Sequence, residues 1–416
     1  MITPPGEGGL GAIRISGYIS HKILKNIFVP GDSSIDRFKL FHMYFGHIIG
    51  RNSEIIDEVT IVLQPEGKSY TGQKQAEIFC HGGRIILEKI LNKIYSLGAR
   101  PAEPGEFTRR AFLNGRIDLA KAEAVADLIA SKTEYSYNSA RDNLLGKLSE
   151  KIDSIRTGSI GLMAEMEASI DYPEEEIEPA QKQALINSLT VIINDIKELV
   201  YSYKGGKIIK EGYKIVIAGR PNAGKSSLFN LFLNQDRAIV TPIPGTTRDY
   251  LEEWINLEGF PVQISDTAGL REKADRIEKV GQISTRNLIK NSDMIIWIVD
   301  ISRRSWKKEF VRDAAEFTNE IPILLVLNKI DKVALEKVKE SIPPKIFSEN
   351  MIVYLSCLTK SGYKALLNII IKKIQSNLPD LTDKLIITSF RHKKKLSNAL
   401  NSFKKVFKSI NRNEPP

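Results

Sequence analysis

The sequence predicts a multidomain protein that joins an α+β part to an α/β part. Three patterns support this prediction. Residues 1–118 mix short strand-like runs with one helix, residues 119–211 have helical periodicity, and residues 212–378 alternate apolar strand-like runs with helices. The last pattern is typical of a mostly parallel sheet, because each return to a parallel strand needs a long connection. At 416 residues, the chain is long enough for two or three domains.

Composition indicates a globular protein, since 42% of the residues are hydrophobic. No apolar run reaches the roughly 18 residues of a membrane-spanning helix, and charges interrupt the apolar segment at 13–27, so no signal peptide is expected. Cys80 and Cys357 are too few for a disulfide framework, and we therefore expect a reducing, cytoplasmic location. The net charge of +10 is compatible with a nucleic-acid partner but does not establish one, and the alternative is a soluble basic enzyme.

Outside the α/β part, the expected elements are short. Strands are predicted at 58–63 and 76–80. A helix with an apolar stripe follows them, and the stripe comprises Ile86, Ile90 and Ile94. Two apolar faces are predicted in the helical region, one of Ala120, Ala124, Leu128 and Ile129 and one of Leu144, Leu148, Ile152 and Ile155.

Residues 379–416 predict a basic amphipathic helix. Its apolar stripe comprises Leu396, Leu400, Phe403, Phe407 and Ile410, and its lysines are Lys393, Lys394, Lys395, Lys404, Lys405 and Lys408. We favour the interpretation that the stripe packs on the helices of 119–210 while the lysines are solvated. The alternative is a helix that binds a membrane or RNA.

A phosphate-binding loop is predicted at 219–226, which reads Gly-Arg-Pro-Asn-Ala-Gly-Lys-Ser. A strand-like run at 213–218 precedes it, and a segment with helical spacing at 227–233 follows it. In such a loop, backbone N–H groups surround the phosphates, and the N-terminus of the helix adds partial positive charge. Lys225 is then placed to reach the β- and γ-phosphates, and the Ser226 hydroxyl to bind Mg²⁺.

Four further segments follow in the order that a guanine-nucleotide-binding domain requires. They are Thr246-Thr247, Asp266-Thr267-Ala268-Gly269, Asn328-Lys329-Ile330-Asp331 and Ser356-Cys357-Leu358. Asp266 ends a strand-like run and is placed to hold Mg²⁺ through water, and Gly269 can offer a backbone N–H to the γ-phosphate. The carboxylate of Asp331 can accept from both the ring N–H and the amine of guanine. Together the five segments predict a GTP-hydrolysing switch with a Ras-like P-loop fold.

Two residues in these motifs are unusual. Leu270 follows the Asp-x-x-Gly segment, where many GTPases carry a glutamine that orients the attacking water. Leucine cannot form that hydrogen bond, so another group must do so. Asn222 lies inside the phosphate loop, and its amide oxygen can ligate a monovalent cation beside the phosphates. Such a cation neutralises charge as an arginine finger does.

Further segments make the chain resemble one family over nearly its whole length. These segments are Thr3-Pro4-Pro5-Gly6 with Gly8-Gly9, Arg14-Ile15-Ser16-Gly17, the twelve residues 104–115 (Pro-Gly-Glu-Phe-Thr-Arg-Arg-Ala-Phe-Leu-Asn-Gly), Asp118-Leu119-Ala120 with Glu123-Ala124-Val125, Ile170-Asp171-Tyr172-Pro173-Glu174-Glu175 and Gly245-Thr246-Thr247-Arg248-Asp249. With the five nucleotide motifs, they resemble the MnmE family of tRNA modification GTPases, also called TrmE.

The resemblance implies three domains. An N-terminal domain, 1–118, binds a reduced folate (5,10-methylenetetrahydrofolate or 5-formyltetrahydrofolate) and dimerises. A helical domain, 119–211 and 379–416, contains the inserted G-domain, 212–378. The resemblance also implies that G-domains pair when K⁺ and GTP are bound. With the FAD-dependent enzyme MnmG, in a heterotetramer, the family installs a carboxymethylaminomethyl or aminomethyl group on the wobble uridine of tRNA.

The resemblance also implies site residues. Ser226 and Thr247 hold Mg²⁺, while K⁺ is held by Asn222, Thr246 and the backbone oxygens of Thr241 and Ile243. Glu278 positions the water, and the catalytic set is Glu278, Lys225 and Thr247. The folate contacts are Arg14, Glu77 and Arg116. The GTP contacts are Asn222, Ala223, Gly224, Lys225, Ser226, Ser227, Thr241, Thr246, Thr247, Asp266, Thr267, Ala268, Gly269, Asn328, Lys329, Asp331, Ser356, Cys357 and Leu358.

The chain departs from the family in two places. After Tyr70-Thr71-Gly72 it reads Gln73-Lys74-Gln75, where the family has Gly-Glu-Asp after the Tyr-Thr. The family's C-terminal Cys-Ile-Gly-Lys has no counterpart, because the chain ends at 413–416. One alternative is an RNA- or ribosome-associated GTPase switch without modification activity, but such proteins typically lack the 105–115 segment. Another is a scaffold without chemistry, against which the intact nucleotide motifs argue.

Overall fold

The computed structural model of the protein describes most of the chain. The described residues are 1–4, 6–50, 53–171, 179–235, 252–266, 288–314, 321–334, 351–376, 378 and 385–412. Contacts between Cα atoms divide the chain into two compact units, Met1–Ala126 with Leu144–Gly146 and Asp127–Asn143 with Lys147–Pro416. No helix in the described part combines the length and the apolar character needed to cross a bilayer.

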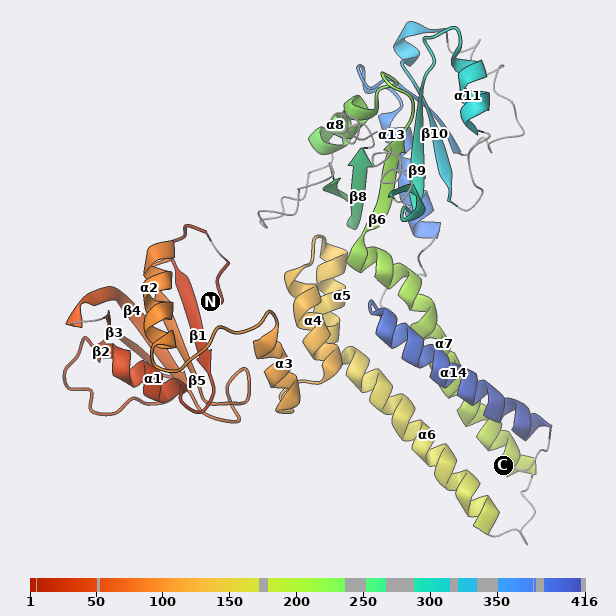
Figure 1. Cartoon of the computed structure of the whole chain (residues 1–416). Helices are drawn as coiled ribbons and strands as arrows, with labels where there is room; N and C mark the ends of the chain where they lie inside the picture. The colour runs from red at the N-terminus through yellow and green to blue at the C-terminus, as the bar shows by residue number, and fades with distance from the viewer. Residues whose placement is uncertain are drawn as a thin grey trace. The chain divides into compact units, whose positions relative to one another are not determined.

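The first unit is built on a five-stranded antiparallel sheet with strand order β1-β5-β4-β3-β2 (Figure 1). The strands are β1 (Gly11–Ser16), β2 (Phe28–Pro30), β3 (Met43–Ile49), β4 (Ile55–Gln64) and β5 (Gln75–Cys80). The strands predicted at 58–63 and 76–80 lie within β4 and β5, so both predictions are confirmed. Val59, Ile61 and Leu63 are at most 2% exposed, because alternate strand residues face one core.

Helices α1 (Ser20–Ile27) and α2 (Arg84–Tyr95) cover the core face of this sheet. Helices α3 (Glu106–Leu113) and α4 (Leu119–Ile129) follow along the chain. The predicted stripe of α2 is confirmed, since Ile90 and Ile94 are buried and Ile86 packs partly buried against the same core. Leu87 joins them, which widens the stripe by one residue. Helix α4 spans the boundary between the two units.

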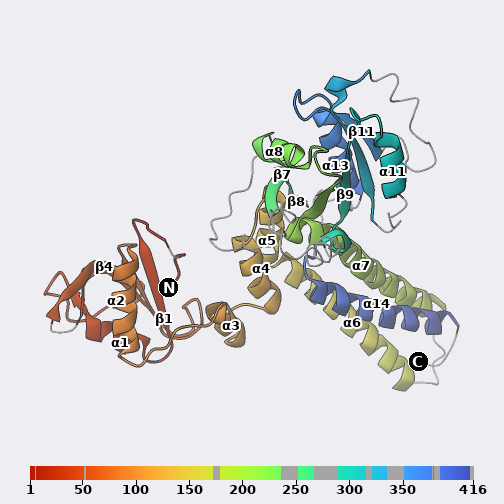
Figure 2. The same ribbon diagram turned by 45° about the horizontal axis from the view of Figure 1, so that its top comes forward.

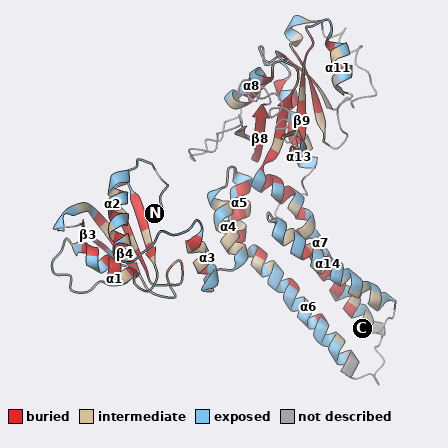
Figure 3. Cartoon of the chain, in the orientation of Figure 1, coloured by how far each residue is buried: buried red, intermediate tan, exposed pale blue. Residues whose placement is uncertain are grey.

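Helices form one part of the second unit. They are α5 (Glu134–Leu144), α6 (Lys147–Asp171), α7 (Pro179–Glu211) and α14 (Phe390–Asn411). Helices α6 and α14 both contact α7, and two views show α14 lying along α7 (Figures 1 and 2). Leu396 and Leu400 are each 8% exposed, so the expected packing of the C-terminal stripe on this helical region is confirmed. Helix α6 is exposed over most of its length (Figure 3).

The two predicted apolar faces of the helical region are only partly buried. In the first face, Ala124 is 2% exposed, whereas Ile129 is 83% exposed. The second face crosses a helix break, because α5 ends at Leu144 and α6 begins at Lys147. Gly146 lies between them with φ of 100°, a left-handed conformation that interrupts a helix.

The other part of the second unit is a six-stranded sheet with order β11-β10-β9-β6-β8-β7. The strands are β6 (Tyr213–Ala218), β7 (Glu252–Leu257), β8 (Phe260–Asp266), β9 (Met294–Asp300), β10 (Ile323–Asn328) and β11 (Ile352–Leu355). Every pair is parallel except β7 with β8, which confirms the mostly parallel sheet predicted for the α/β part. The carboxyl ends of the parallel strands therefore meet at one edge, where ligands of such sheets bind.

Both faces of this sheet are covered. The helices are α8 (Lys225–Gln235), α11 (Trp306–Ala314) and α13 (Tyr363–Ser376), with a 3₁₀ helix at Ile330–Lys332. Residues of α8 and α13 share one core with Leu324 and Val326 of β10. The alternate residues Leu325 and Leu327 pack instead with Trp306 of α11. A strand buried on both faces explains why residues 323–327 of β10 form a continuous apolar run.

Candidate active site

The phosphate-binding loop connects the end of β6 at Ala218 to the start of α8 at Lys225. Two of its glycines have backbone conformations that favour glycine, with φ of 150° at Gly219 and 107° at Gly224. A Cβ added to Gly224 would overlap the side-chain amide of Asn328. The loop therefore has its conformation only because this position lacks a side chain.

Asn328 joins three of the predicted motifs. Its side chain is almost fully buried, and its Nδ2 donates to the backbone oxygen of Ala223 at 2.9 Å. Its Oδ1 accepts from the backbone N–H of Cys357 at 3.2 Å. The phosphate loop, the Asn-Lys-Ile-Asp segment and the Ser-Cys-Leu segment are thus held in one arrangement by a single amide.

The side chains predicted to contact the phosphates and Mg²⁺ lie at the ends of neighbouring parallel strands. Lys225 is buried at the first position of α8, and its Nζ donates to the backbone oxygens of Gly219 at 3.1 Å and Arg220 at 3.0 Å. The Ser226 hydroxyl donates to Asp266 Oδ2 at 3.2 Å. Hence the ammonium group, the predicted Mg²⁺ ligand Ser226 and Asp266, which was predicted to act on Mg²⁺ through water, come together around the loop.

This pair of oxygens fits Mg²⁺. The described residues contain no group of three or more His, Cys, Asp and Glu side chains that could hold a metal. A magnesium site of a nucleotide-hydrolysing domain needs none, because phosphate oxygens and water complete the octahedron. A hydroxyl from Ser226 and a carboxylate from Asp266 are ligands of the hard type that Mg²⁺ prefers.

The guanine side is organised by Ser356. This serine is fully buried, donates to Asp331 Oδ1 at 2.5 Å and accepts from the backbone N–H of Thr359 at 3.2 Å. Asp331 itself is exposed, so its carboxylate is fixed in direction and open to a base. Burial raises the pKa of Cys357 to about 11, which keeps this thiol protonated and makes it a packing group. Leu358 is 81% exposed beside it.

Asn222 has a left-handed backbone with φ of 61°, which asparagine tolerates better than most residues. Its side chain is exposed at the mouth of the loop, as is that of Ser227.

Several predicted residues lie outside the described part of the chain, and they are Thr241, Ile243, Thr246, Thr247, Arg248, Thr267, Ala268, Gly269, Leu270, Arg271 and Glu278.

Sequence analysis missed Asp300. It is the last residue of β9, it is 7% exposed, and its Oδ2 lies 2.5 Å from Lys329 Nζ. The same Nζ donates to the backbone oxygen of Asn222 at 3.0 Å. A signal was present, because Asp300 ends an apolar strand as Asp266 does, at the same edge of the sheet.

In the first unit, Arg14 and Glu77 are direct partners across β1 and β5. Arg14 Nε lies 2.8 Å from Glu77 Oε1, and the guanidinium lies 4.8 Å from the ring centroid of Tyr70 and 5.5 Å from that of Phe107. Arg116, the third residue predicted for folate, is exposed and donates to the backbone oxygen of Ser69 at 3.2 Å. The structure thus brings two of the three predicted residues together.

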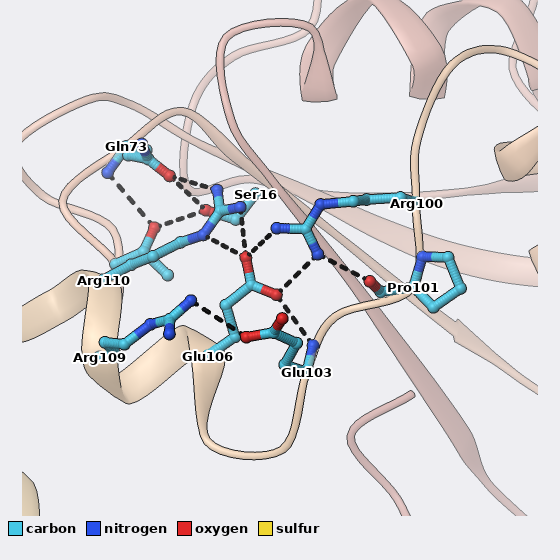
Figure 4. A network of polar contacts seen from close by, with 9 residues as sticks. Ser16, Gln73, Arg100, Pro101, Glu103, Glu106, Arg109 and Arg110 are labelled. Atoms are coloured by element: carbon cyan, nitrogen blue, oxygen red, sulfur yellow. Dashed lines mark hydrogen bonds and ion pairs between the residues drawn. The ribbon is translucent and has the colours of Figure 1, made fainter.

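A second polar cluster of this unit surrounds Glu106, whose side chain is 3% exposed (Figure 4). Its carboxylate lies 2.6 Å from Arg100 Nη2 and 2.6 Å from Arg110 Nη2, and it accepts from the backbone N–H of Glu103 at 2.9 Å. The hydrogen bonds from Arg100 are the main reason that the pKa of Glu106 falls to about 2. Arg110 also donates to Gln73 Oε1 at 2.9 Å.

A cavity of about 560 Å³ lies next to both clusters. Its lining includes Arg14, Tyr18, Lys74, Arg100, Phe107 and Arg110. With Tyr95, the lining has three aromatic side chains, and its four cationic side chains outnumber the carboxylates of Glu66 and Glu106, which suits a ligand with a flat ring and carboxylates. Glu77 and Arg116 are not part of the lining.

Known proteins resemble this chain over both units. A family profile described as "GTP-binding protein TrmE N-terminus" matches residues 1–116, and one described as "MnmE helical domain" matches 119–416. The tRNA modification GTPase MnmE of Carboxydothermus hydrogenoformans is 41% identical over 99% of this chain and 89% of that protein. The same-named proteins of Natranaerobius thermophilus and Clostridioides difficile are 42% and 40% identical, over 94% and 97% of this chain and 85% and 87% of their own lengths. Among solved structures, the G domain of the T. maritima FeoB iron transporter is 23% identical over 39% of this chain and 98% of that domain, with a TM-score of 0.28.

Proposed function

The chain belongs to the MnmE family of tRNA modification GTPases, and from that premise we propose that it is a K⁺-dependent GTP hydrolase that drives 5-carboxymethylaminomethyl modification of the tRNA wobble uridine. The main structural support for GTP hydrolysis is the buried amide of Asn328, because it joins the phosphate loop to the guanine-binding loop. The partners in this proposal are a second copy of the chain, tRNA and the FAD-dependent enzyme MnmG, in a heterotetramer.

In the proposed reaction, the protein binds GTP between the phosphate loop and the 3₁₀ helix Ile330–Lys332. Lys225 turns from the loop carbonyls to the β- and γ-phosphates and offsets their charge. Ser226 and Thr247, with Asp266 acting through water, would hold Mg²⁺, and the bound ion would supply electrostatic stabilisation of the developing charge. Asp331, aimed by Ser356, selects guanine.

Asn222 is the residue proposed to hold K⁺. Its amide is exposed at the mouth of the loop, and its own backbone oxygen is engaged by Lys329, which fixes the direction of the turn. In this proposal, K⁺ bound at Asn222 supplies the positive charge that an arginine finger supplies in other GTPases. We expect hydrolysis in KCl to exceed hydrolysis in NaCl of equal concentration, and Asn222→Ala to lose that difference. Equal rates in both salts would remove K⁺ from the proposal.

The first unit is proposed to bind a reduced folate. Gln75 lies on β5 beside Glu77, and its Nε2 donates to Glu77 Oε1 at 3.1 Å. Its own Oε1 is buried without a hydrogen-bond partner among the described residues. Gln75 is fully buried, so it orients Glu77, whose carboxylate is the acceptor proposed for the N–H groups of a pterin, while Arg14 and the other cations of the cavity suit the glutamate tail.

The departure at 73–75 is compatible with this proposal. The Gln73 Oε1 accepts from Arg110 at 2.9 Å, so this arginine has a hydrogen-bond partner in the segment that departs from the family. In the same proposal the domains are 1–118, 119–211 with 379–416, and the inserted 212–378. The first of these would dimerise.

The decisive experiment reconstitutes the modification. The purified chain, MnmG, methylenetetrahydrofolate, GTP and undermodified tRNA are incubated, and the tRNA nucleosides are separated by mass spectrometry. We expect the wobble uridine to gain mass only when all components are present. Hydrolysis of GTP without any modified uridine, with MnmG shown to be active beside another family member, would favour the alternative of an RNA- or ribosome-associated switch.

A further inference from the structure

Helix α14 carries an unusually one-sided charge. Over its 22 residues it contains six lysines and one arginine and no aspartate or glutamate. Lysines on the neighbouring helices behave differently, because Lys151 pairs with Asp195 at 2.7 Å and Lys210 with Asp127 at 2.8 Å. The positive charge of α14 is therefore not balanced within its own helix.

The apolar side of α14 packs against α7. Just before the helix, the backbone N–H of Ile387 donates to the Ser202 hydroxyl at 3.1 Å, and its carbonyl approaches Gly206 so closely that a Cβ there would overlap it. The Phe390 ring lies 6.2 Å from that of Tyr203, and Lys393 Nζ lies 4.9 Å from the Tyr203 centroid. These contacts fix the rotation of α14 about its axis, and they leave its apolar stripe occupied.

Five lysines remain on the outward side. Lys394, Lys395, Lys404, Lys405 and Lys408 are all exposed, and they form no ion pair with the described residues. At 3.6 residues per turn, Lys394, Lys405 and Lys408 lie within about 60° of one another around the helix. Lys394 and Lys405 are separated by about 16 Å along the axis. Asn398 and Asn401 fall between them on the same face.

This arrangement suits a nucleic-acid backbone. Lysines that bind phosphates release condensed counterions, which is the main source of sequence-independent affinity. Asparagine side chains between them can donate to phosphate or ribose oxygens. A membrane surface would need an apolar face as well as the charge, and that face of α14 packs on α7.

We propose that the outward face of α14, defined by Lys394, Lys405 and Lys408 with Asn398 and Asn401, binds the phosphate backbone of RNA. Resting on the proposed function, that RNA is the tRNA substrate. The face reads no bases, and it orients the tRNA on the protein while other parts of the complex select the wobble position.

The test measures binding of fluorescently labelled tRNA to the full chain by anisotropy, between about 0.05 and 0.2 M KCl. The variant is Lys394→Ala, Lys405→Ala, Lys408→Ala. Its matched control is Lys22→Ala, Lys25→Ala, Lys364→Ala, which removes equal charge from exposed positions on other helices. A second variant replaces the three α14 lysines by arginine, which keeps the charge.

We expect the alanine variant to bind tRNA about tenfold more weakly near 0.1 M salt. The slope of log K against log salt should become shallower by about 2, because three phosphate contacts are lost. The arginine variant and the control should bind like the wild type, and the GTPase rate of all three should be unchanged.

Two results would overturn the proposal while leaving the proposed function intact. One is wild-type tRNA affinity in the alanine variant, and the other is an equal loss in the control, which would mean that net charge alone acts. Loss of binding to phosphatidylserine vesicles by the α14 variant, with tRNA binding unaffected, would assign the face to membranes instead. If the wild type binds no tRNA at all, both this proposal and the tRNA partner fall.

Discussion

Asp300 and Lys329 form an ion pair with an Nζ–Oδ2 distance of 2.5 Å, between the last residue of β9 and the residue that follows β10. Burial alone would raise the pKa of Asp300, but the hydrogen bonds from Lys329 and Ser302 outweigh it, and the pKa lies below its usual range. Since Lys329 Nζ also binds the backbone oxygen of Asn222, Asp300 acts on the phosphate loop through this lysine.

Asp300→Asn should therefore weaken nucleotide binding more than it slows turnover. A hydrogen bond to a charged group is worth about 1.5–3 kcal/mol, which corresponds to about a tenfold or larger rise in the dissociation constant of GDP. The measurement compares GDP affinity with kcat at saturating GTP. Arg303→Ala is the control, because Arg303 lies 3.6 Å from the same carboxylate and is 44% exposed. An unchanged GDP affinity in Asp300→Asn would show that Lys329 holds its place without Asp300.

Gly224→Ala should disrupt the nucleotide-binding site at the phosphate loop itself. The added Cβ overlaps the Asn328 amide and meets a backbone with φ of 107°. We expect GTP affinity to fall by more than about tenfold, because Asn328 can no longer hold Ala223. Gly161→Ala in the middle of α6 is the matched control, since nothing lies within 4 Å of its added Cβ. Normal nucleotide binding by Gly224→Ala would mean that the loop relaxes at little cost.

The α/β part was largely predictable from sequence because its signals are local. The apolar runs extend almost to the carboxyl ends of their strands, where the motif residues lie, as Asn328 ends β10 after the apolar residues 323–327. The long-range pairs were not predictable in this way. Arg14 and Glu77 are 63 positions apart, and their contact depends on the register of β1 on β5.

The break between α5 and α6 could not be predicted from the apolar periodicity of the sequence. Apolar spacing continues through it, so periodicity alone predicts one face. The left-handed Gly146 ends that regularity, and a lone glycine in a helical pattern does not by itself specify a stop.

The cluster around Glu106 was missed for another reason, because its segment was assigned by resemblance and its carboxylate was given no role.

The Glu106 cluster predicts a pH dependence of stability. Its pKa of about 2 lies below that of an unfolded chain, so the unfolded state binds more protons as the pH falls. The stability from this group is present above about pH 4.3 and is lost as the pH falls toward 2. Urea unfolding of wild type and Glu106→Gln should differ at pH 7, and the difference should shrink with acidification. Glu103→Gln, at an exposed position that pairs with Arg109, should show no such trend. A difference that stays constant with pH would refute the assignment.

The family resemblance implies that Glu278 positions the attacking water, a role that Leu270 cannot perform, and we propose this role here. Glu278→Ala should lower kcat by about 10²–10⁴-fold with little change in KM, since such a group acts on the transition state. Asp331→Asn should have the reverse profile, with weaker binding and less discrimination between GTP and other nucleotides. If Glu278→Ala turns over at the wild-type rate, the phosphate itself, Arg248 or Arg271 would be examined next.

Reduced folate should bind the first unit despite the Gln73-Lys74-Gln75 departure. Titration calorimetry with 5-formyltetrahydrofolate should give a dissociation constant of about 0.1 mM or tighter in the full chain. Glu77→Gln should weaken binding, because it replaces one acceptor oxygen by an NH₂ donor and removes the negative charge that pairs with Arg14 at 2.8 Å. Glu58→Gln is the matched control, since Glu58 lies on β4 of the same sheet with its side chain 61% exposed. Absence of heat from folded wild-type protein would mean that Gln73, Lys74 and Gln75 have removed the site. The chain would then retain hydrolysis of GTP without a one-carbon donor of its own.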